Sequence, residues 1–448
     1  MKEMNGKEIL DAISGKQIAG SLDNIVKGVC QDSRLIKKGE AFFAIKGAAF
    51  DGHNFIDNAI NGDASVIVYD NPLAIDKDKA NGTLLILVPD STKALQDLAR
   101  YYLSKMNAKI IGVTGSTGKT STRDMMYYVC RQKYKTAKNR GNYNTVVGVP
   151  LTILEMDIDT QVAVLEMGMD RFGEIDTMAE LTRPDIGVIT NIGVSHLEHL
   201  GSREGIMDAK MEITNYFDEN NVLIISEGED LLVRENVHGE YKVVVTGINK
   251  NCDLVIEDIR ETGDNSISFT IKNGNDFKVI DLPVPGRHNA LNASLAIAAG
   301  LELGITFDEA AQGLKGMELT GKRLAIKDVN GIKIIDDTYN ASPDSMKAAL
   351  ETLFNTEGQR KVAVLGDMYE LGENEEEYHK AIGEFAKTKA DVVFTIGDLA
   401  KNINKELNYK TREEFILAQA RFFQKGDVVL FKASRGMALE KVIEKLFY

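Results

Sequence analysis

Chemistry is indicated first by the segment Gly112-Val-Thr-Gly-Ser-Thr-Gly-Lys119-Thr120, which lies between an apolar run and a helical pattern. Glycines allow a backbone to wrap round a phosphate group, amides at a helix start point toward it, and Lys119 adds a mobile cation. The Thr120 hydroxyl is of the type that binds Mg²⁺ in such loops. The standard spacing requires glycine where this chain has Val113. We still expect a nucleotide-binding loop; the alternative is a glycine-rich turn with an incidental lysine.

A carboxylate and two histidines follow the next strand candidates. Glu166 ends the apolar run 162–165, and the carboxyl end of a parallel strand beside a phosphate loop is where a Mg²⁺ ligand belongs. The alternative is a solvated glutamate at a strand end. His196 follows the strand candidate Ile186–Thr190, and His199 lies three residues on. We do not expect zinc, because the sequence offers no third soft ligand; a structural histidine remains the alternative.

One lysine lies in a helical stretch after these histidines. Lys210 belongs to the segment Glu204–Asn215. Taken by itself, a lysine in such a helix is expected to be a solvated surface residue.

The elements that position these residues alternate between short apolar runs and helical patterns. An N-terminal region, to about residue 105, mixes two strand-like runs with one helix-like stretch: Ser65–Tyr69, Leu84–Val88 and Thr92–Lys105. The phosphate loop then opens an α/β region with a buried, mostly parallel sheet. Its expected elements are Lys109–Val113, a helix from Lys119 to about Arg131, Val162–Glu166, Ile186–Thr190, Val222–Ser226, Val243–Thr246, β structure over Asp253–Val279, and the helix Asn289–Leu303.

A third alternation begins at about residue 318. Helical stretches separate four strand candidates, an order typical of a doubly wound sheet. The strand candidates are Ile332–Asp336, Val362–Leu365, Val392–Ile396 and Val428–Phe431.

Length and charge restrict the kind of protein. A chain of 448 residues is too long for one ordinary core and fits two or three domains. Its formal net charge of −14 argues against nonspecific binding to a nucleic-acid backbone. The polar start, the absence of a long apolar stretch and three widely spaced cysteines predict a cytoplasmic protein. We expect a monomer that binds neither nucleic acid nor membranes.

Several of these segments, in this order, resemble the Mur ligases, which build the stem peptide of peptidoglycan. The resemblance covers essentially the whole chain. It includes the phosphate loop, the strand end at Glu166, Thr190–His196, Gly286-Arg-His-Asn289-Ala-Leu-Asn292, Arg323 and Asp337. Folylpolyglutamate synthetases share several of these features. The resemblance implies an α/β fold of three domains: a small UDP-sugar-binding domain (1–105), a central phosphate-loop ATPase domain with a parallel sheet (106–317), and a C-terminal Rossmann-like, doubly wound domain (318–448) that closes over ATP and binds the incoming dipeptide.

Other segments resemble the branch of the family that adds a dipeptide. They are Asp336–Met346, Leu365–Gly372 and Lys432-Ala-Ser-Arg-Gly-Met437, together with Asp32-Ser-Arg34 and Asp51-Gly-His-Asn-Phe55 in the N-terminal domain. The implied reaction is an ATP-dependent, ADP-forming ligation of UDP-N-acetylmuramoyl-tripeptide to D-alanyl-D-alanine, through an acyl phosphate. Relatives often show a second asparagine where this chain has Thr145, so a substrate contact by Thr145 is not expected.

The resemblance also implies cofactors and residue roles. ATP would be used with two Mg²⁺ ions, which would be bound by Thr120, Glu166, His196 and a carbamylated Lys210. Catalytic roles are implied for Lys119, Glu166, His196, Lys210 and Arg323. Nucleotide contacts are implied for Thr114, Gly115, Ser116, Thr117, Gly118, Lys119, Thr120, Asn289, Asn292, Arg323 and Asp337, although Asn289 could instead cap a helix. Substrate contacts are implied for Ser33, Arg34, Lys46, His53, Asn142, Asn144, Tyr339, Asn340 and Ser342.

Three alternatives remain open from the sequence. One is another ligase of the superfamily, which adds an amino acid or glutamate. Another is a phosphate-loop ATPase or kinase that acts as a switch, which would leave the N-terminal motifs unexplained. The last is an inactive binding module, which the presence of Lys119, Glu166 and His196 together disfavours.

Overall fold

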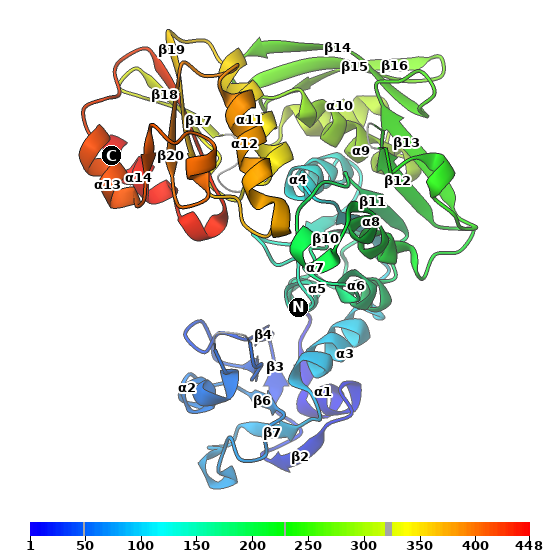
Figure 1. Cartoon of the computed structure of the whole chain (residues 1–448). Helices are drawn as coiled ribbons and strands as arrows, with labels where there is room; N and C mark the ends of the chain where they lie inside the picture. Colours follow the sequence, from blue (N-terminus) through cyan, green and yellow to red (C-terminus); the bar gives the residue numbers. More distant parts are fainter. Residues whose placement is uncertain (48–49, 228–229, 319–324) are drawn as a thin grey trace. The chain divides into compact units, whose positions relative to one another are not determined.

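The computed structural model describes residues 1–47, 50–227, 230–318 and 325–448 (Figure 1). The chain divides into two units. Neither unit is continuous in sequence, and each is described by itself. Unit 1 consists of Met1–Gly112, Tyr134–Gly168 and Glu174–Asp185. Unit 2 consists of Val113–Lys133, Met169–Gly173 and Ile186–Tyr448. Strand β8 (Lys109–Thr114) runs from unit 1 into unit 2, so the phosphate loop that follows it belongs to unit 2.

Unit 1 begins with a five-stranded sheet in the order β2-β7-β6-β5-β4. The strands are Lys16–Ala19, Leu84–Leu87, Val66–Tyr69, Glu40–Phe43 and Gly28–Cys30. All neighbours pair in parallel except β2 with β7. Alternate apolar side chains of β5, β6 and β7 form a core with helix α2 (Ile56–Asn61), because side chains on a strand point to opposite faces in turn.

The other described residues of unit 1 include a parallel pair of strands and four α-helices. The parallel pair is β9 (Thr136–Lys138) with β10 (Val162–Glu166). The helices are α1 (Gly6–Ala12), α3 (Ser91–Leu103), α5 (Gly148–Glu155) and α6 (Glu174–Thr182). A short antiparallel pair, β1 (Met4–Asn5) with β3 (Ile25–Val26), completes it.

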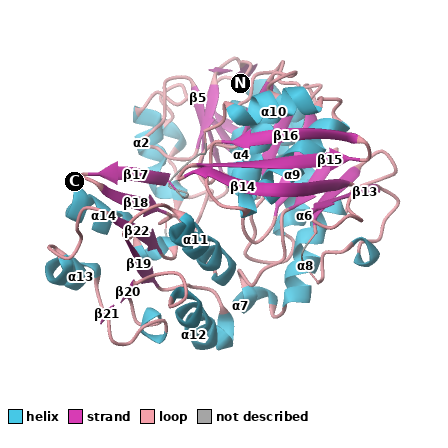
Figure 2. Ribbon diagram, turned by 90° about the horizontal axis from the view of Figure 1, so that it is seen from above, coloured by secondary structure: helices cyan, strands magenta, loops and turns pink. Residues whose placement is uncertain are grey.

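The first half of unit 2 carries strands in the order β16-β15-β14-β13-β12-β11. They are Asp276–Leu282, Ser266–Asn273, Leu254–Gly263, Lys242–Gly247, Val222–Ser226 and Ile186–Ile189. Strands β11 to β14 pair in parallel, whereas β14, β15 and β16 form an antiparallel meander. Figure 2 shows the meander beside helices α4 (Lys119–Cys130), α9 (His288–Glu302) and α10 (Phe307–Lys315), which pack on one another. The shorter helices α7 (Leu197–Leu200) and α8 (Arg203–Met211) follow β11.

The second half of unit 2 is a sheet in the order β17-β18-β22-β19-β20-β21. The strands are Ala325–Val329, Ile332–Asp336, Asp427–Lys432, Arg360–Gly366, Val392–Ile396 and Asn408–Tyr409. Only β17 pairs antiparallel. Helices α11 (Pro343–Asn355) and α12 (Glu375–Ala386) cover one face, and α13 (Arg412–Gln419) and α14 (Glu440–Phe447) cover the other (Figure 2). The predicted doubly wound sheet is confirmed.

Most of the predicted elements are confirmed to within two residues. The structure adds short strands that the sequence did not indicate, such as β2, β4 and β9. Among the described residues, no helix is both long enough and apolar enough to cross a membrane.

Candidate nucleotide-binding site

The phosphate loop of unit 2 turns on two glycines with positive φ. Gly115 has φ of +146° and Gly118 has φ of +78°, a region that residues with a β-carbon rarely adopt. Helix α4 begins directly after Gly118, so its first amides lie at the loop. The Nζ of Lys119 donates to the carbonyl oxygens of Gly115 (2.6 Å) and Ser116 (3.2 Å), which holds the ammonium against the loop. Thr120 is buried in the first turn of the helix.

The segment after β11 braces this loop. Thr117 donates its backbone N–H to Oδ1 of Asn191 (2.9 Å), and the Asn191 amide donates to the Thr117 hydroxyl (2.7 Å). Thr190 donates its hydroxyl to the Thr117 carbonyl (2.5 Å), and Gly193 N–H donates to the Ser116 hydroxyl (2.9 Å). The Thr190–His196 motif therefore begins with residues that fix the shape of the loop.

Asn289 and Asn292 lie on one face of α9, as their spacing predicted. Both are buried, and the Asn292 amide donates to Oδ1 of Asn289 (3.0 Å). The Asn289 amide donates to the Pro285 carbonyl (2.7 Å). Asn289 does not cap the helix, because the N-cap is Arg287. A β-carbon added at Gly118 would lie 2.7 Å from Oδ1 of Asn292, so this asparagine lies directly against the phosphate loop.

In unit 1, Glu166 is held by two asparagines. Glu166 donates its backbone N–H to Oδ1 of Asn139 (2.7 Å), and the Asn139 amide donates to the Glu166 carbonyl (3.0 Å). The Asn144 amide donates to Oε1 of Glu166 (2.8 Å), which orients the carboxylate. Asn142 is exposed, and the Thr145 hydroxyl accepts from Gly148 N–H (3.2 Å). Asn144, predicted as a substrate contact, thus also supports the predicted metal ligand.

His196 lies between two carboxylates of unit 2. Its Nδ1 is 2.7 Å from Oε2 of Glu370 and 3.2 Å from Oδ1 of Asp170. One ligand atom from each of the three residues falls within 4.8 Å of the others. Two carboxylates and one imidazole fit a hard divalent cation better than a soft one. Contact with His196 lowers the pKa of the Glu370 carboxyl group. No role was predicted for Asp170 or Glu370, although Glu370 lies in the segment Leu365–Gly372, which resembles the dipeptide-adding branch of the family.

The prediction that Lys210 is a solvated surface residue is wrong. The side chain is 1% exposed, in the last turn of α8. Burial, and then the nearby Lys119 ammonium, lower the pKa of Lys210 well below its usual range. The site therefore disfavours a bare ammonium at this position.

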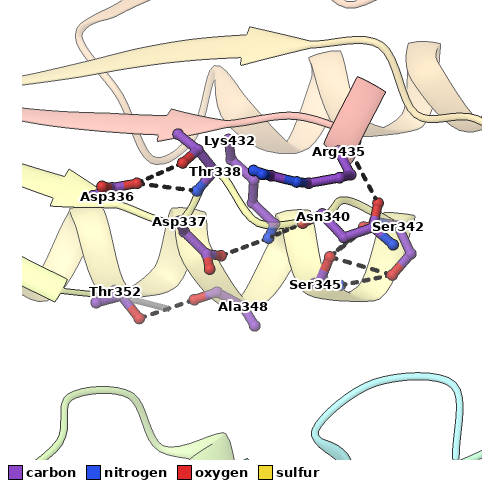
Figure 3. A network of polar contacts seen from close by, with 10 residues as sticks. All are labelled: Asp336, Asp337, Thr338, Asn340, Ser342, Ser345, Ala348, Thr352, Lys432 and Arg435. Carbon is purple, nitrogen blue, oxygen red and sulfur yellow. Dashed lines mark hydrogen bonds and ion pairs between the residues drawn. The ribbon is translucent and has the colours of Figure 1, made fainter. Parts of the chain in front are cut away.

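The C-terminal sheet carries the remaining nucleotide and dipeptide candidates (Figure 3). Asp337 follows β18, and one of its oxygens accepts from Nζ of Lys432 (2.5 Å). The Asn340 carbonyl accepts from the same ammonium (2.9 Å), and the Ser342 hydroxyl caps α11. Tyr339 lies in the same loop. Arg323 lies outside the described residues.

The predicted UDP-sugar residues lie in unit 1. Ser33 precedes Arg34, whose exposed guanidinium pairs with the Asp32 carboxylate (2.7 Å), and this contact lowers the pKa of Asp32. Lys46 forms an isolated antiparallel β-bridge with Asp51.

His53 is buried in the same region. Its Nδ1 lies 2.6 Å from Asp51 and its Nε2 lies 3.0 Å from Asp70. Both ring nitrogens thus face carboxylates, so His53 links Asp51 with Asp70.

Fold and site together define an α/β protein with a phosphate loop at the carboxyl end of a strand and a separate doubly wound sheet. Residues 25–103 match the model described as Mur ligase family, catalytic domain. Residues 113–300 match the Mur ligase middle domain, and 322–435 match the Mur ligase, glutamate ligase domain. The chain belongs to the Mur ligase family, whose members use ATP.

Relatives resemble the chain over nearly its whole length. It is 41% identical to the UDP-N-acetylmuramoyl-tripeptide–D-alanyl-D-alanine ligase of Bacillus subtilis (strain 168), over 96% of both chains. Its fold is similar to a crystal structure of MurF from Acinetobacter baumannii (TM-score 0.90, 29% identity, 100% of this chain and 99% of that chain). It is also similar to MurF ligase from Thermotoga maritima in complex with ADP (TM-score 0.84, 31% identity, 94% and 97%).

Proposed function

We propose that this protein is the ligase that joins D-alanyl-D-alanine to UDP-N-acetylmuramoyl-tripeptide, with cleavage of ATP to ADP and phosphate. The observation that carries this conclusion is the 41% identity to a ligase of that name over 96% of both chains. The ADP complex of the Thermotoga maritima relative supports the nucleotide. In this reaction the tripeptide carboxylate attacks the γ-phosphate of ATP, and ADP leaves. The dipeptide amine then attacks the carbonyl carbon of the acyl phosphate, and phosphate leaves as the amine loses a proton.

The physical difficulty is to bring an anion up to a polyanion. Two like unit charges 4 Å apart repel by about 4 kcal/mol at an effective dielectric constant near 20. Triphosphate carries several such charges, so Lys119 alone does not offset them. Two Mg²⁺ ions, when bound, supply the missing positive charge and orient the transfer. We assign Thr120 and Glu166 to the first ion, and His196 to the second. The carboxylates of Asp170 and Glu370 beside His196 support this assignment, because Mg²⁺ prefers oxygen ligands.

Lys210 is proposed to be carbamylated. A carbamate replaces a cation by an anion, and the burial of Lys210 beside Lys119 supports that exchange. Lys210→Ala is expected to lose activity and to regain part of it with added bicarbonate or short carboxylates. A ¹³C-bicarbonate NMR signal that is present in the native protein and missing from Lys210→Ala gives a second measurement. A wild-type rate in Lys210→Ala refutes the role.

The other roles follow the family pattern. The loop Thr114–Thr120 is assigned to the phosphates, Asn289, Asn292 and Asp337 to the nucleoside, and Arg323 to the γ-phosphate. Ser33, Arg34, Lys46, His53, Asn142 and Asn144 are assigned to the UDP-sugar, and Tyr339, Asn340 and Ser342 to the dipeptide. We further propose three domains with boundaries near residues 105 and 317, of which the third closes over ATP. Small-angle scattering that shows no compaction with an ATP analogue and substrate contradicts the closure.

A cytoplasmic, monomeric state is part of the proposal. The cytoplasmic location is supported by the three cysteines, all free in the structure, which suit a reducing compartment. Light scattering coupled to size-exclusion chromatography tests the monomer.

The deciding experiment is a coupled assay of ADP and phosphate release with identification of the product by mass spectrometry. Both UDP-tripeptides, ending in lysine or in diaminopimelate, are tested with D-alanyl-D-alanine, a diamino acid or glutamate as acceptor. We expect pentapeptide only with the dipeptide, and ADP only when the acceptor is present. Glu166→Gln and Lys119→Ala are the inactive controls. Amide formation with glutamate or a diamino acid, but not with the dipeptide, overturns the proposal.

A further inference from the structure

The segment Lys432-Ala-Ser-Arg-Gly-Met437 has no role in the reaction as described so far, and its first residue is an unusual lysine. Strands β18 and β22 are parallel neighbours in which Asp336 pairs with Phe431. Asp337 directly follows β18, and Lys432 is the last residue of β22. By alternation they lie on the same face as Ile335, which packs toward α11.

Lys432 is almost completely buried, with 2% of its side chain exposed. Its Nζ donates to Oδ2 of Asp337 (2.5 Å) and to the carbonyl oxygen of Asn340 (2.9 Å), as Figure 3 shows. Asp337 also donates its backbone N–H to the carbonyl of Phe431 (3.1 Å). Main chain and carboxylate of Asp337 are thus both fixed by consecutive residues of β22. A buried ammonium with a carboxylate partner holds that carboxylate firmly, because neither charge can turn to solvent.

The segment 432–437 also hydrogen-bonds to the loop after β19, on the other side of β22. Ser434 donates its backbone N–H to the Asp367 carbonyl (3.0 Å), and its hydroxyl accepts from Tyr369 N–H (2.9 Å). Strand β22 lies between β18 and β19 in the sheet, so this segment connects the loops that follow both neighbours. Lys432 hydrogen-bonds to the loop that contains Asp337, and Ser434 hydrogen-bonds to the loop after β19.

We infer that Lys432 is a positioning residue for ATP: it fixes the Asp337 carboxylate in the orientation that binds the ribose hydroxyls, without itself contacting the nucleotide. The inference rests on the proposed role of Asp337. It predicts that loss of the Lys432 ammonium removes recognition of the ribose rather than the chemistry of phosphoryl transfer. Nucleotides that lack a ribose hydroxyl report this effect, because the Asp337 contact is already absent from them.

The test compares ATP with 2′-deoxy-ATP and 3′-deoxy-ATP, by calorimetric Kd and by kcat/KM, in the full-length enzyme. We expect the wild type to prefer ATP over at least one analogue by about tenfold or more, as a charge-assisted hydrogen bond would give. Lys432→Met is expected to reduce this preference to less than about threefold, with kcat at saturating ATP changed by less than about threefold. Arg435→Met removes a cation three residues away whose guanidinium pairs with Glu440 (2.9 Å), and should keep the preference.

Asp337→Asn distinguishes the proposed role of Asp337 from the proposed role of Lys432. If Asp337→Asn keeps the wild-type preference, the ribose contact assigned to Asp337 is wrong. If Asp337→Asn loses the preference and Lys432→Met keeps it, the role of Lys432 is overturned while the proposed function stands. Urea unfolding checks that each variant is folded. Should Lys432→Met fail to fold, Lys432→Gln, whose amide can still donate to Asn340, takes its place with the same expected result.

Discussion

Substitution of Gly118 by alanine tests whether the phosphate loop depends on the contact with Asn292. An added β-carbon would lie 2.7 Å from Oδ1 of Asn292 and 3.4 Å from its Cγ. Asn292 is 8% exposed and donates to Asn289, so it cannot move without loss of that hydrogen bond. The loop must shift, or the asparagine pair must separate.

The magnitude follows from two contributions. A residue with a β-carbon in the left-handed region costs about 1–2 kcal/mol, and this applies at any glycine with such a φ. Loss of the buried Asn292–Asn289 hydrogen bond adds about 1 kcal/mol. A shift of the loop by about 1 Å lowers the rate up to about 100-fold, because the phosphates are then misplaced. We therefore expect kcat/KM for ATP to fall by about 10- to 100-fold in Gly118→Ala.

Gly274→Ala is the matched control. Gly274 has φ of +59° in the turn between β15 and β16, and an added β-carbon would have no atom within 4 Å. Both variants should lose about 1 kcal/mol or more in urea unfolding, whereas only Gly118→Ala should lose activity with ATP. Equal kcat/KM for ATP in the two variants would refute the argument from Asn292.

Three further outcomes are expected. Asn144→Ala removes the amide that orients Glu166 and should raise the Mg²⁺ concentration for half-maximal activity about 10- to 100-fold, measured by titration of the metal. Arg360→Met leaves the buried Asp427 carboxylate without the guanidinium 2.6 Å away, and should lower the free energy of unfolding in urea by about 3 kcal/mol. Burial, and then the Lys432 ammonium, lower the pKa of His288 to about 4. The unfolded chain therefore takes up a proton on this histidine below about pH 6.5, whereas the folded chain takes it up only near pH 4. The free energy of unfolding should thus fall by about 2 kcal/mol between pH 7 and pH 5, and His288→Asn should not show this part of the decrease.

Each of these three predictions is contradicted by a different result. An unchanged Mg²⁺ requirement in Asn144→Ala would show that the amide does not orient a metal ligand. The exposed pair of Lys7 with Asp11 is the control for Arg360, and Lys7→Met should change stability by less than about 0.5 kcal/mol. If the free energy of unfolding depends on pH equally in the wild type and in His288→Asn, other groups cause the acid sensitivity.

Local patterns predicted the strands of the parallel sheets because each is a short, nearly continuous apolar run between turn residues. Val162–Glu166 and Ile332–Asp336 have the predicted bounds. The short strand β9 was missed because Thr136–Lys138 has neither an apolar run nor alternation, and only its pairing with β10 makes it a strand.

The position of Lys210 was predicted wrongly from its residue type, although the spacing carried the signal. Ile206, Ala209 and Ile213 form the apolar stripe of this helical segment, and Lys210 falls on the same stripe. A lysine on a buried stripe points to a function or a partner, since burial of an unpaired ammonium is costly.

The contact of His196 with Glu370 joins residues that are 174 positions apart (370 − 196). It could not be found from spacing, because no periodicity links the two segments and their approach is set by the tertiary structure.

Neutral amides brace the predicted ligands in both units, and there is a physical reason for this choice. Asn139 and Asn144 hold Glu166, Asn191 braces the phosphate loop, and Asn292 lies against that loop. An amide both donates and accepts, so one side chain can fix a backbone N–H and a backbone carbonyl, as Asn191 does with those of Thr117. An aspartate in the same place would add an anion beside the proposed triphosphate site, and each pair of like unit charges repels by about 4 kcal/mol at 4 Å and an effective dielectric constant near 20. A lysine would compete with Lys119 and the metal ions for the phosphates. Asparagine therefore shapes the loop without altering the charge that the phosphates meet.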